Sequence, residues 1–504
     1  MNYDEIVVGS GAGGAVVAAR LSEDPGRSVL LIEAGPDYPS VAELPADLKD
    51  PWVSLADHDW KYTASYRPGR ELPYPRGLVI GGSTSVNAAA AMRGSPADFG
   101  DWADLGHDEW GYDAVLPYYR KLETQAGADV DPLIHGTDGP IWISCAGRPD
   151  WDLAGEMFCQ AVARQGVPIV AEHNAGSSRA VGPISHNVRD GLRVSTAVGY
   201  LAPARGRPNL TIRSGCLADR VVVSNGQATG VEVIADGRRE RIAGGRVTLA
   251  AGVIGTPSIL LRSGVGAACA VRSLGLDVVV DAPGVGTNLK DHQPVFMTAL
   301  AAPGVPQDPE RYFEFYYRDR RTYIALLTLF GERPLGVFFG DPSSPPIIAL
   351  APAVARPQSA GTIRLRSADP AAPPRIDLNF LSDPADLQAL TDAVRLSWDL
   401  LHSPELGGLV KTILPPVADI IGDEAALRSW MLQTCGTGFH PVGTCRMGPA
   451  GSGAVTDQHG RVHGIRGLRI ADASIMPDLV SSPVNLTCIM IGERIADWMR
   501  AETR

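Results

Sequence analysis

The sequence is poor in cysteine and in aromatic residues, and it contains no long apolar run. Its seven cysteines are scattered, without CxxC pairs or zinc-type spacing, so the sequence predicts no metal site and favours a reducing, cytoplasmic setting. No stretch reaches the roughly 18 apolar residues that a membrane-spanning helix needs, so we expect no membrane partner. Because no basic segment followed by a long apolar stretch comes after Met1, we also expect no signal peptide.

Positive charge is scarce as well. The chain has 45 Lys and Arg against 56 Asp and Glu, which gives a formal net charge of −11. This balance argues against an extended phosphate-neutralising surface, so nucleic acid is not an expected partner. With 45% hydrophobic and 20% charged residues, the composition is instead that of a globular enzyme. A length of 504 residues favours two or three domains over one hydrophobic core.

Glycine and proline, by contrast, are abundant, with 56 and 40 residues. Their excess indicates many turns and close backbone approaches, as expected where loops wrap a large ligand. The N-terminus has the order strand, glycine-rich turn and helix, at Tyr3–Val8, Gly9–Gly14 and Ala15–Leu21. In this pattern Gly9 permits the tight turn, Gly11 lets the backbone approach a pyrophosphate, and Gly14 lets the helix pack closely on the strand.

A second apolar run, Ser28–Ile32, ends at Glu33, which follows Gly14 by 19 residues. The carboxylate of Glu33 is placed to accept hydrogen bonds from ribose hydroxyls, and an acid here disfavours a 2′-phosphate. The positive end of the intervening helix faces the phosphates. The pattern therefore predicts a dinucleotide site, but by itself it does not separate FAD from NAD.

A second glycine-rich loop lies at Arg76–Asn87, where Gly81 and Gly82 precede three hydroxyl residues and an alanine-rich run that we expect to be helical. One interpretation is that the backbone of this loop presses against a flat ring or a phosphate. The other is an ordinary junction between loop and helix, with Ser83 or Ser85 as the N-cap. The loop alone does not decide between them.

Two long segments, Arg76–Arg93 and Ala250–Gly266, resemble the signature patterns of the glucose-methanol-choline oxidoreductase family. Further similar stretches follow in family order at His135–Pro140, Arg193–Ala197, Gly286–His292, and from Gly438–Pro441 to Asp497. The resemblance implies FAD as the cofactor. It also implies an α/β fold, in which a Rossmann-like FAD-binding domain is interleaved with a second domain built on a mainly antiparallel sheet.

We expect the FAD-binding domain at 1–150, 206–298 and 431–504, and the substrate-binding domain at 151–205 and 299–430. In the second domain the pattern predicts strands near Ile347–Leu350 and Gly361–Leu365 and a helix at Asp383–Leu401. The aromatic cluster Tyr312–Tyr317 has two interpretations. It is either a lip of the substrate pocket or a partner surface, or an amphipathic surface helix with a buried aromatic face.

Attachment of the flavin is a point on which this chain departs from some family members. Those members carry a histidine immediately before the asparagine of the second glycine loop and tether the flavin through it. This chain has Val86 before Asn87. We therefore predict that FAD is bound non-covalently.

The C-terminal quarter supplies the expected catalytic pair, His440 and Asn485, by family resemblance. Hydride leaves an alcohol carbon more readily as the hydroxyl loses its proton, and a neutral imidazole can accept that proton near pH 7. An amide that holds the same oxygen would aim the C–H bond at the flavin. Many relatives have histidine at the second position, so Asn485 leaves open how strongly the alkoxide is stabilised.

Both residues also have structural interpretations. His440 is either the base, a packing residue beside Pro441, or a contact of FAD alone. Asn485 is either the orienting group or a turn or N-cap residue before the apolar run that follows it. A helix that starts near Asn485 would aim its positive end at the isoalloxazine C2 carbonyl, where negative charge accumulates on reduction. The block that begins at Asp472 is expected near the flavin.

The expected activity is FAD-dependent oxidation of a primary or secondary alcohol by hydride transfer to flavin N5, with O₂ or another electron acceptor. The alternatives are a hydroxynitrile-lyase-type enzyme that retains FAD without redox turnover, and a silent flavin-binding protein. The sequence does not name the alcohol, the acceptor or the oligomeric state. The expected cofactor contacts are Gly9, Ser10, Gly11, Ala12, Gly13, Gly14, Glu33, Ala34, Gly81, Gly82, Ser83, Ser85, Asn87, Ala88, Ala218, Ala251, Gly252, Asp472 and Ala473.

Overall fold

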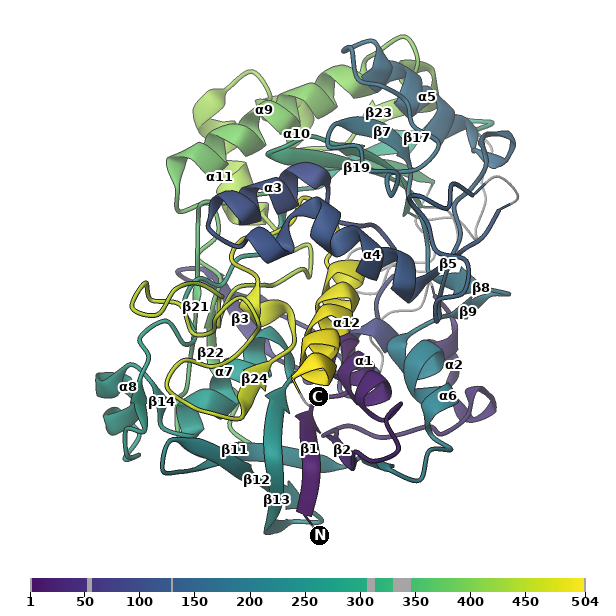
Figure 1. Cartoon of the computed structure of the whole chain (residues 1–504). Helices are drawn as coiled ribbons and strands as arrows, with labels where there is room; N and C mark the ends of the chain where they lie inside the picture. Colours follow the sequence, from purple (N-terminus) through teal and green to yellow (C-terminus); the bar gives the residue numbers. More distant parts are fainter. Residues whose placement is uncertain (1, 52–56, 128–129, 306–312, 330–345, 503–504) are drawn as a thin grey trace.

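The two N-terminal apolar runs form neighbouring strands of a parallel sheet. The computed structural model describes residues 2–51, 57–127, 130–305, 313–329 and 346–502 (Figure 1). In it β1 (Asn2–Val8) pairs in parallel with β2 (Val29–Ile32), and α1 (Ala12–Leu21) connects them. All four residues of β2 are buried, as expected of a parallel strand that is covered on both faces. The predicted order of strand, turn, helix and strand is confirmed, with the helix starting at Ala12 instead of Ala15.

This sheet continues beyond the N-terminal unit on both sides. In space its strands follow the order β10 (Leu210–Arg213), β2, β1, β13 (Arg238–Leu249), β12 (Gln227–Ala235) and β11 (Cys216–Ser224), and β24 (Leu468–Ile470) also pairs with β13. β10, β2, β1, β13 and β24 run parallel to one another. β12 pairs antiparallel with both β13 and β11. The expected Rossmann-like unit is thus assembled from the N-terminal, middle and C-terminal parts of the chain.

A second large sheet, in the upper part of Figure 1, is antiparallel in every described pairing. Its order is β23 (Val410–Ile413), β17 (Met297–Ala301), β20 (Ile347–Val354), β19 (Thr322–Leu329), β18 (Phe313–Arg318) and β7 (Ala180–Pro183), with β16 (Gln293–Pro294) against β20. Helices α9 (Pro384–Leu401) and α5 (Leu153–Ala163) pack on its outer face. This confirms the expected antiparallel sheet.

The aromatic cluster near residue 315 is part of a strand, so its interpretation as a surface helix is wrong. β18 is hydrogen-bonded to β19 on one side and to β7 on the other, and its residues Phe315, Tyr316 and Tyr317 are buried. Alternation along the strand sends successive rings to opposite faces of the sheet, so both faces need apolar side chains. Tyr312 of the cluster lies outside the described residues.

A small sheet joins segments that are far apart in the sequence. It has the order β21 (Thr362–Arg364), β22 (Arg375–Asp377), β3 (Thr63–Arg67) and β4 (Arg70–Pro73). The predicted strand near Gly361–Leu365 is therefore confirmed as β21, although it pairs outside the large antiparallel sheet. The predicted helix is confirmed as α9, whose N-cap Asp383 accepts a hydrogen bond from the backbone N of Ala385 at 2.8 Å. The domain boundaries remain a prediction.

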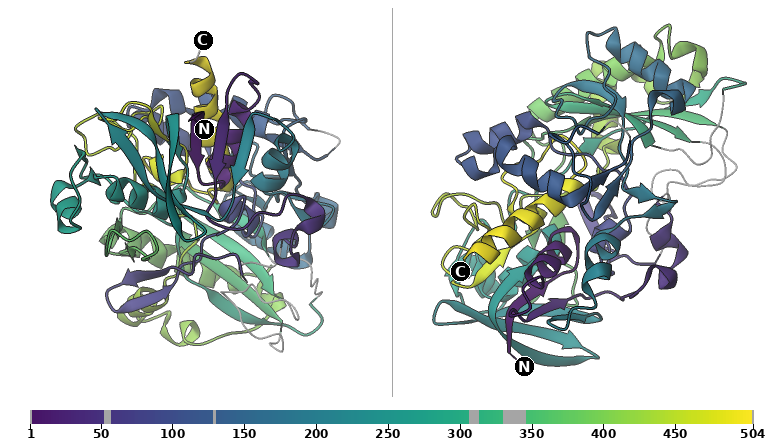
Figure 2. Two further views of the ribbon diagram at one scale, coloured as in Figure 1. Left: turned by 90° about the horizontal axis from the view of Figure 1, so that it is seen from below. Right: turned by 45° about the vertical axis from the view of Figure 1, so that its right-hand side comes forward.

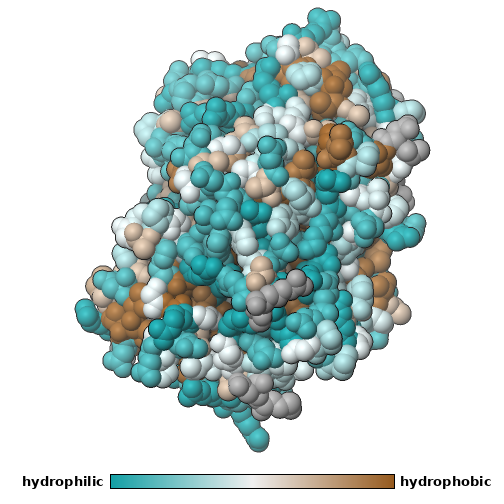
Figure 3. Space-filling view, in the orientation of Figure 1, coloured by the Kyte–Doolittle hydropathy of each residue, from teal (hydrophilic) through white to brown (hydrophobic). Residues whose placement is uncertain are grey.

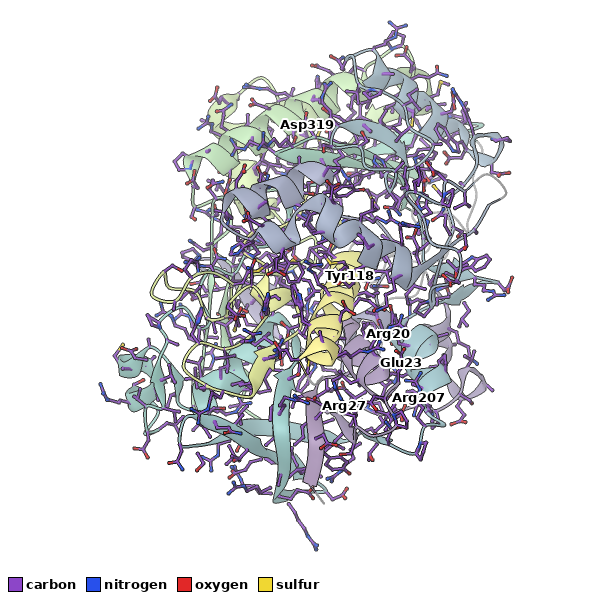
Figure 4. The ribbon with its side chains drawn as sticks, in the orientation of Figure 1. Arg20, Glu23, Arg27, Tyr118, Arg207 and Asp319 are labelled. Carbon is purple, nitrogen blue, oxygen red and sulfur yellow. The ribbon has the colours of Figure 1, made fainter. Side chains whose placement is uncertain are left out.

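The C-terminal helix α12 (Asn485–Ala501) lies against α1 between the two large sheets, as Figure 1 and the right-hand view of Figure 2 show. The helices meet at glycines, since a Cβ on Gly492 would lie 2.9 Å from the carbonyl oxygen of Gly13. Buried Glu493 accepts hydrogen bonds from Arg20 of α1 at 2.7 Å and from the Tyr200 hydroxyl at 2.8 Å. Arg20 lies beside Glu23 at the end of α1 (Figure 4). These buried contacts fix the position of the N-terminus of α12.

Further helices complete the shell of the molecule. The longer ones are α3 (Pro96–Asp104), α4 (Tyr112–Leu122), α7 (Gly252–Arg262) and α11 (Glu424–Thr434). Hydrophilic residues cover most of the face in Figure 3, and hydrophobic residues gather there in separate patches. Across the described parts of the chain, no helix combines the length and the apolar character needed to cross a membrane.

Candidate active site

The turn between β1 and α1 lines one wall of a long cavity. Gly9 has a φ of +96°, and a Cβ there would lie 2.4 Å from the carbonyl oxygen of Ala250. A Cβ on Gly11 would meet only the Cα of Gly82, at 4.0 Å. The backbone at Gly11 therefore faces open space, where a ligand can approach closely.

The other two glycines of the turn serve packing. A Cβ on Gly14 would lie 1.9 Å from the carbonyl oxygen of Gly9, as the predicted close approach of helix and strand requires. A Cβ on Gly13 would lie 1.8 Å from the carbonyl oxygen of Ala471. Because Gly13 has no side chain, the C-terminal segment at Ala471 can pack against the turn. The motif alone does not reveal this role.

Glu33 follows β2 and lies at one end of the cavity, with its carboxylate held by the protein. Its Oε2 accepts hydrogen bonds from the backbone N of Ser10 at 3.0 Å and from the Ser10 hydroxyl at 2.6 Å, while Oε1 accepts one from the backbone N of Gly35 at 2.9 Å. Burial raises the pKa of Glu33, and these hydrogen bonds oppose that rise. Ser10 itself lies behind the cavity wall and orients the acid.

The second glycine loop lies directly against the first. Gly81 and Gly82 both have positive φ, at 89° and 53°, and a Cβ on Gly82 would lie 2.9 Å from the Cα of Gly11. The backbone N of Gly81 also donates to the Ser10 hydroxyl at 3.2 Å. Because the two turns touch, the glycines of the second loop help shape the same cavity, which favours the first interpretation of this loop.

The predicted helix after the second loop is wrong. Residues 88–91 are not helical, since Ala89 has a φ of +54°, Ala90 forms a β-bridge with His186, and the backbone N of Ala91 donates to the carbonyl oxygen of Ser185 at 2.7 Å. Neither serine is an N-cap, since Ser85 donates its hydroxyl to the carbonyl oxygen of Ile80 at 2.9 Å. Alanine has a high helix propensity, but pairing with the neighbouring backbone overrides it here.

Asp472 connects the C-terminal segment to the start of α7. Its Oδ2 accepts hydrogen bonds from the backbone N of Gly252 at 2.9 Å and from the Thr256 hydroxyl at 2.6 Å, and its Oδ1 accepts one from the backbone N of Ser474 at 2.8 Å. This buried carboxylate therefore accepts three hydrogen bonds from the protein. They bring Ala251, Gly252 and Ala473, all predicted contacts, to the same wall.

These walls enclose one cavity of about 570 Å³ that runs from Glu33 past both glycine turns to His440 and Asn485. Its size is typical of sites for organic ligands. Among the predicted contacts, all but Ser10, Gly14, Gly81 and Ser85 line the cavity. Both predicted catalytic residues line it as well. The structure thus brings together residues that are more than 400 positions apart in the sequence.

The loop that carries His440 is clamped by a buried carboxylate. Asp291 accepts hydrogen bonds from the Tyr74 hydroxyl at 2.6 Å, the Thr437 hydroxyl at 2.5 Å and the backbone N of His440 at 2.8 Å. The residue before His440, Phe439, has a φ of +59°. Asp291 therefore holds a strained turn and fixes where the imidazole begins.

The imidazole of His440 contacts a second histidine. Nδ1 of His440 lies 2.9 Å from Nδ1 of His292, and Nε2 of His292 lies 2.9 Å from the carbonyl oxygen of Val480. Burial lowers the pKa of His440 well below its usual range, and the neighbouring His292 and Arg76 lower it further. Burial also lowers the pKa of His292, to about 4. Both rings are therefore neutral near pH 7.

Asn485 is the first residue of α12, which confirms the predicted start of that helix. Val484 is the N-cap, so the N-cap interpretation of Asn485 is wrong. Within the described chain, the buried Nδ2 of Asn485 has no hydrogen-bond partner. A buried amide donor without a partner is costly, and a ligand group in the cavity would satisfy it.

The cavity fits a dinucleotide that carries a redox-active ring. Glycine backbone of both turns lines it, as close approach of a pyrophosphate requires, and the N-terminus of α1 begins at this turn. One end offers the carboxylate of Glu33, and the other offers His440, the open amide of Asn485 and the N-terminus of α12. FAD matches this order of groups.

Several lining residues lie outside the sequence predictions. Aromatic and small side chains of the antiparallel sheet line the reacting end, and so does Arg76. His292 belongs to the family-like stretch Gly286–His292, but no residue pattern shows that it touches His440, which is 148 positions away. Alternation along β18 to β20 is the only signal that could have found the sheet residues.

Comparisons with known proteins agree with this geometry. Two family models described as GMC oxidoreductase match residues 3–294 and 357–492. The chain is 37% identical to an uncharacterised GMC-type oxidoreductase of Rhodococcus erythropolis, over 97% of both proteins. It is 35% identical to an oxygen-dependent choline dehydrogenase of Klebsiella pneumoniae, over 99% of this chain and 96% of that protein.

Solved structures give the same result. The pyridoxine 4-oxidase from Mesorbium loti superposes with a TM-score of 0.90 at 30% identity, over 99% of each chain. A formate oxidase superposes with a TM-score of 0.89 at 26% identity, over 99% of this chain and 98% of that one. The chain therefore belongs to the GMC oxidoreductase family and is an FAD-dependent oxidoreductase that acts on CH–OH groups.

Proposed function

We propose that the protein oxidises a primary or secondary alcohol and that His440 is the base that takes the hydroxyl proton. The observation that carries the proposal is a neutral imidazole that lines the same cavity as the unpartnered amide of Asn485. Bound FAD would supply the two-electron acceptor, taking the hydride of the carbinol carbon at N5. The remaining work, which is to orient the alcohol and move its proton, falls to the residues of the chain.

The electrostatics of His440 suit a base that works without a charged partner. Its backbone is fixed by Asp291, but the carboxylate accepts from the backbone N and leaves the ring neutral. Burial and Arg76 disfavour the imidazolium, so the ring is ready to accept a proton over the whole neutral range. Because burial and Arg76 disfavour the imidazolium, His440 also releases the proton readily after turnover.

Asn485 complements this base from the N-terminus of α12. Its Nδ2 can donate to the alcohol oxygen while its position is fixed by the helix that Glu493 and Arg20 anchor. The positive end of α12 also stabilises negative charge that develops nearby. Together the two groups would hold the oxygen from two directions and leave the C–H bond free to point at the flavin.

At the nucleotide end, we propose that Glu33 binds the ribose and that the glycine turns hold the pyrophosphate. Val86 offers no nucleophilic atom, so the flavin would be held without a covalent bond. Precipitation of the yellow protein with acid tests this point. The supernatant should contain all of the FAD, whereas yellow colour that stays with the washed polypeptide would contradict non-covalent binding.

The test of the activity is anaerobic addition of alcohols to the purified yellow protein. A suitable alcohol should bleach the flavin, and the corresponding aldehyde or ketone should appear in equal amount. Admission of air then shows whether O₂ reoxidises the flavin or another acceptor is needed. A flavin that no alcohol bleaches, in a protein that cleaves a cyanohydrin, would contradict the proposal and favour the lyase alternative.

A further inference from the structure

The antiparallel sheet shows its cavity face to the reacting end. Along β20, the larger side chains Ile348 and Leu350 belong to the core on the side of α9, whereas Ala349 and Ala351 belong to a separate cluster on the cavity side. This alternation follows from the period of two along a strand. From Ala349 to Ala353, the cavity side of β20 therefore carries only methyl groups.

On the cavity side of the sheet, one residue from each of three neighbouring strands forms a row. Tyr316 of β18 is opposite Ala325 of β19, and Ala325 is opposite Ala351 of β20. The rings of Tyr316 and Tyr323 stack with centroids 4.8 Å apart and form one wall, while Leu327 lies on the other side of Ala325 along β19. All five side chains line the cavity. The two alanines thus form the floor of an apolar hollow, which we call the alanine floor.

Charge near this floor has one sign. The carboxylates that line the cavity in the described chain are Glu33 and Asp472, and protein donors already occupy both. Asp291 lies behind His440 and is occupied by three donors. Arg76, by contrast, reaches the carbonyl oxygen of Phe439 at 3.0 Å and lowers the pKa of His440. A cationic substrate would therefore lose its water and find no free counter-ion among the described residues.

We propose that the substrate is an uncharged alcohol with an apolar body, which docks on the alanine floor with its CH–OH group at His440 and Asn485. The proposal rests on the proposed function and narrows its substrate. It predicts a different preference from the one in the name of its choline dehydrogenase relatives, because no carboxylate among the described residues faces the floor. Stacking also closes the inner faces of Tyr316 and Tyr323, which an aromatic cage for a quaternary ammonium would need open.

Choline and 3,3-dimethylbutan-1-ol form the decisive pair, since a tert-butyl group replaces the trimethylammonium group at nearly equal shape. The flavin of the holoenzyme should be reduced by the neutral alcohol with a kcat/KM on the order of 100-fold higher than that for choline. Equal or better reduction by choline would overturn the substrate class and leave the proposed function intact. Failure of every alcohol, neutral or charged, would instead remove the proposed function itself.

A binding measurement tests the floor without turnover. A tertiary alcohol such as 2-phenylpropan-2-ol has no hydrogen on its carbinol carbon, so it can bind but cannot be oxidised. Calorimetric titration of the holoenzyme should give a dissociation constant that Ala351→Leu raises roughly tenfold or more by filling the hollow. The control Ala385→Leu adds the same side chain at an exposed site on α9 and should leave it unchanged. An unchanged constant in both variants would overturn the docking site.

A separate observation concerns the hydrogen-bond chain behind His440. The carbonyl oxygen of Val480 can only accept, so the Nε2 of His292 beside it carries the hydrogen. A neutral His292 then has a bare Nδ1, and the 2.9 Å contact between the two Nδ1 atoms requires a hydrogen on Nδ1 of His440. The bare nitrogen of His440 is therefore Nε2. From this chain we infer that His292 is a positioning residue that fixes the tautomer of His440.

Two variants and one spectrum test this role. His292→Leu removes the acceptor and should lower kcat roughly 10- to 100-fold with KM and FAD content unchanged. His292→Asn keeps an acceptor at the Nδ1 position and should restore most of kcat. In ¹⁵N spectra of the wild-type holoenzyme, His440 should show a protonated Nδ1 and a bare Nε2. A protonated Nε2, or an Asn variant as slow as the Leu variant, would overturn the assignment.

Discussion

The two ends of the cavity are built from different materials. At the nucleotide end, the wall is largely glycine backbone, and close contacts such as that between Gly82 and Gly11 set its shape. At the reacting end, the wall consists of side chains from a loop, a helix N-terminus and a sheet. Only the second end can change its chemistry by single substitutions without moving the backbone.

This difference predicts where substitutions are tolerated. A glycine that meets a backbone atom closer than about 3 Å leaves no room for any side chain, so the nucleotide end tolerates almost no variation. The alanine floor, in contrast, accepts larger or charged residues at the cost of the hollow alone. Specificity is therefore expected to reside at the reacting end, and the two ends should respond differently to mutation.

The largest effect is expected for His440→Ala. Loss of the base should slow anaerobic flavin reduction by roughly 10²- to 10⁴-fold, while the distant nucleotide end still holds FAD. Stopped-flow absorbance measures the rate, and the ratio of flavin to protein absorbance measures FAD content. His402→Ala, at the exposed end of α9, is the control and should behave as wild type. A normal reduction rate in His440→Ala would sink its assignment as the base.

The opposite response is expected for Gly82→Ala. A Cβ there would lie 2.9 Å from the Cα of Gly11 and would push the two glycine turns apart. FAD affinity should fall roughly 10- to 100-fold, whereas the protein that does hold FAD should keep a nearly normal reduction rate. Fluorescence of released flavin measures the dissociation constant.

Gly69→Ala is the matched control for this variant. Gly69 also has a positive φ, of +80°, but a Cβ there would have no neighbour within 4 Å. Both variants therefore carry the backbone strain, and only Gly82→Ala adds the contact. Equal FAD affinity in the two variants would show that strain alone, and not the approach of the two turns, governs the nucleotide end.

The same difference explains how much could be predicted from the sequence. The unit from Gly9 to Glu33 was predictable because each residue acts through its neighbours in one short β-α-β segment. The contact between Gly13 and Ala471 was not, because it depends on where a strand from the far end of the chain joins the sheet. Local patterns carry no information on such pairings.

At the reacting end, the sequence supplied candidates without their arrangement. Family resemblance placed His440 and Asn485 in motifs, but nothing local showed that His292 contacts His440. Of the two interpretations of the aromatic cluster, the surface helix is wrong because strand pairing on both sides outweighs the amphipathic pattern of a short segment. Residues that act across the fold become visible only when the fold is known.

A smaller effect is expected for Asn485→Ala, which removes the unpartnered donor. The rate of flavin reduction should fall about tenfold, as for one hydrogen bond to a developing charge, with FAD content unchanged. Asn485→His keeps a donor and should recover much of the rate, whereas Asn485→Asp loses it and should not. If Asn485→Asp matched wild type, the residue would not act as a donor to the alcohol oxygen.

The smallest effect is expected from pH, and it also distinguishes the two ends. Burial lowers the pKa of His440 from its usual value near 6.5, so the base stays neutral above that value and kcat/KM should be flat from about pH 7 to 9. As pH falls through the lowered pKa, His440 becomes protonated and kcat/KM should decline. Protonation of the buried ring also costs folding free energy, so stability present above pH 6.5 is lost on the acid side.

Glu33 responds to acid with the opposite sign. Its pKa is raised by burial, so protonation relieves the cost of a buried charge instead of creating one. A protonated Glu33 offers fewer acceptor lone pairs to the ribose hydroxyls, so FAD affinity should fall as the pH is lowered through its raised pKa. Parallel titrations of reduction rate and of free-flavin fluorescence measure the two ends separately. FAD affinity that stays constant down to the pH at which the protein unfolds would contradict the ribose-binding role of the Glu33 carboxylate.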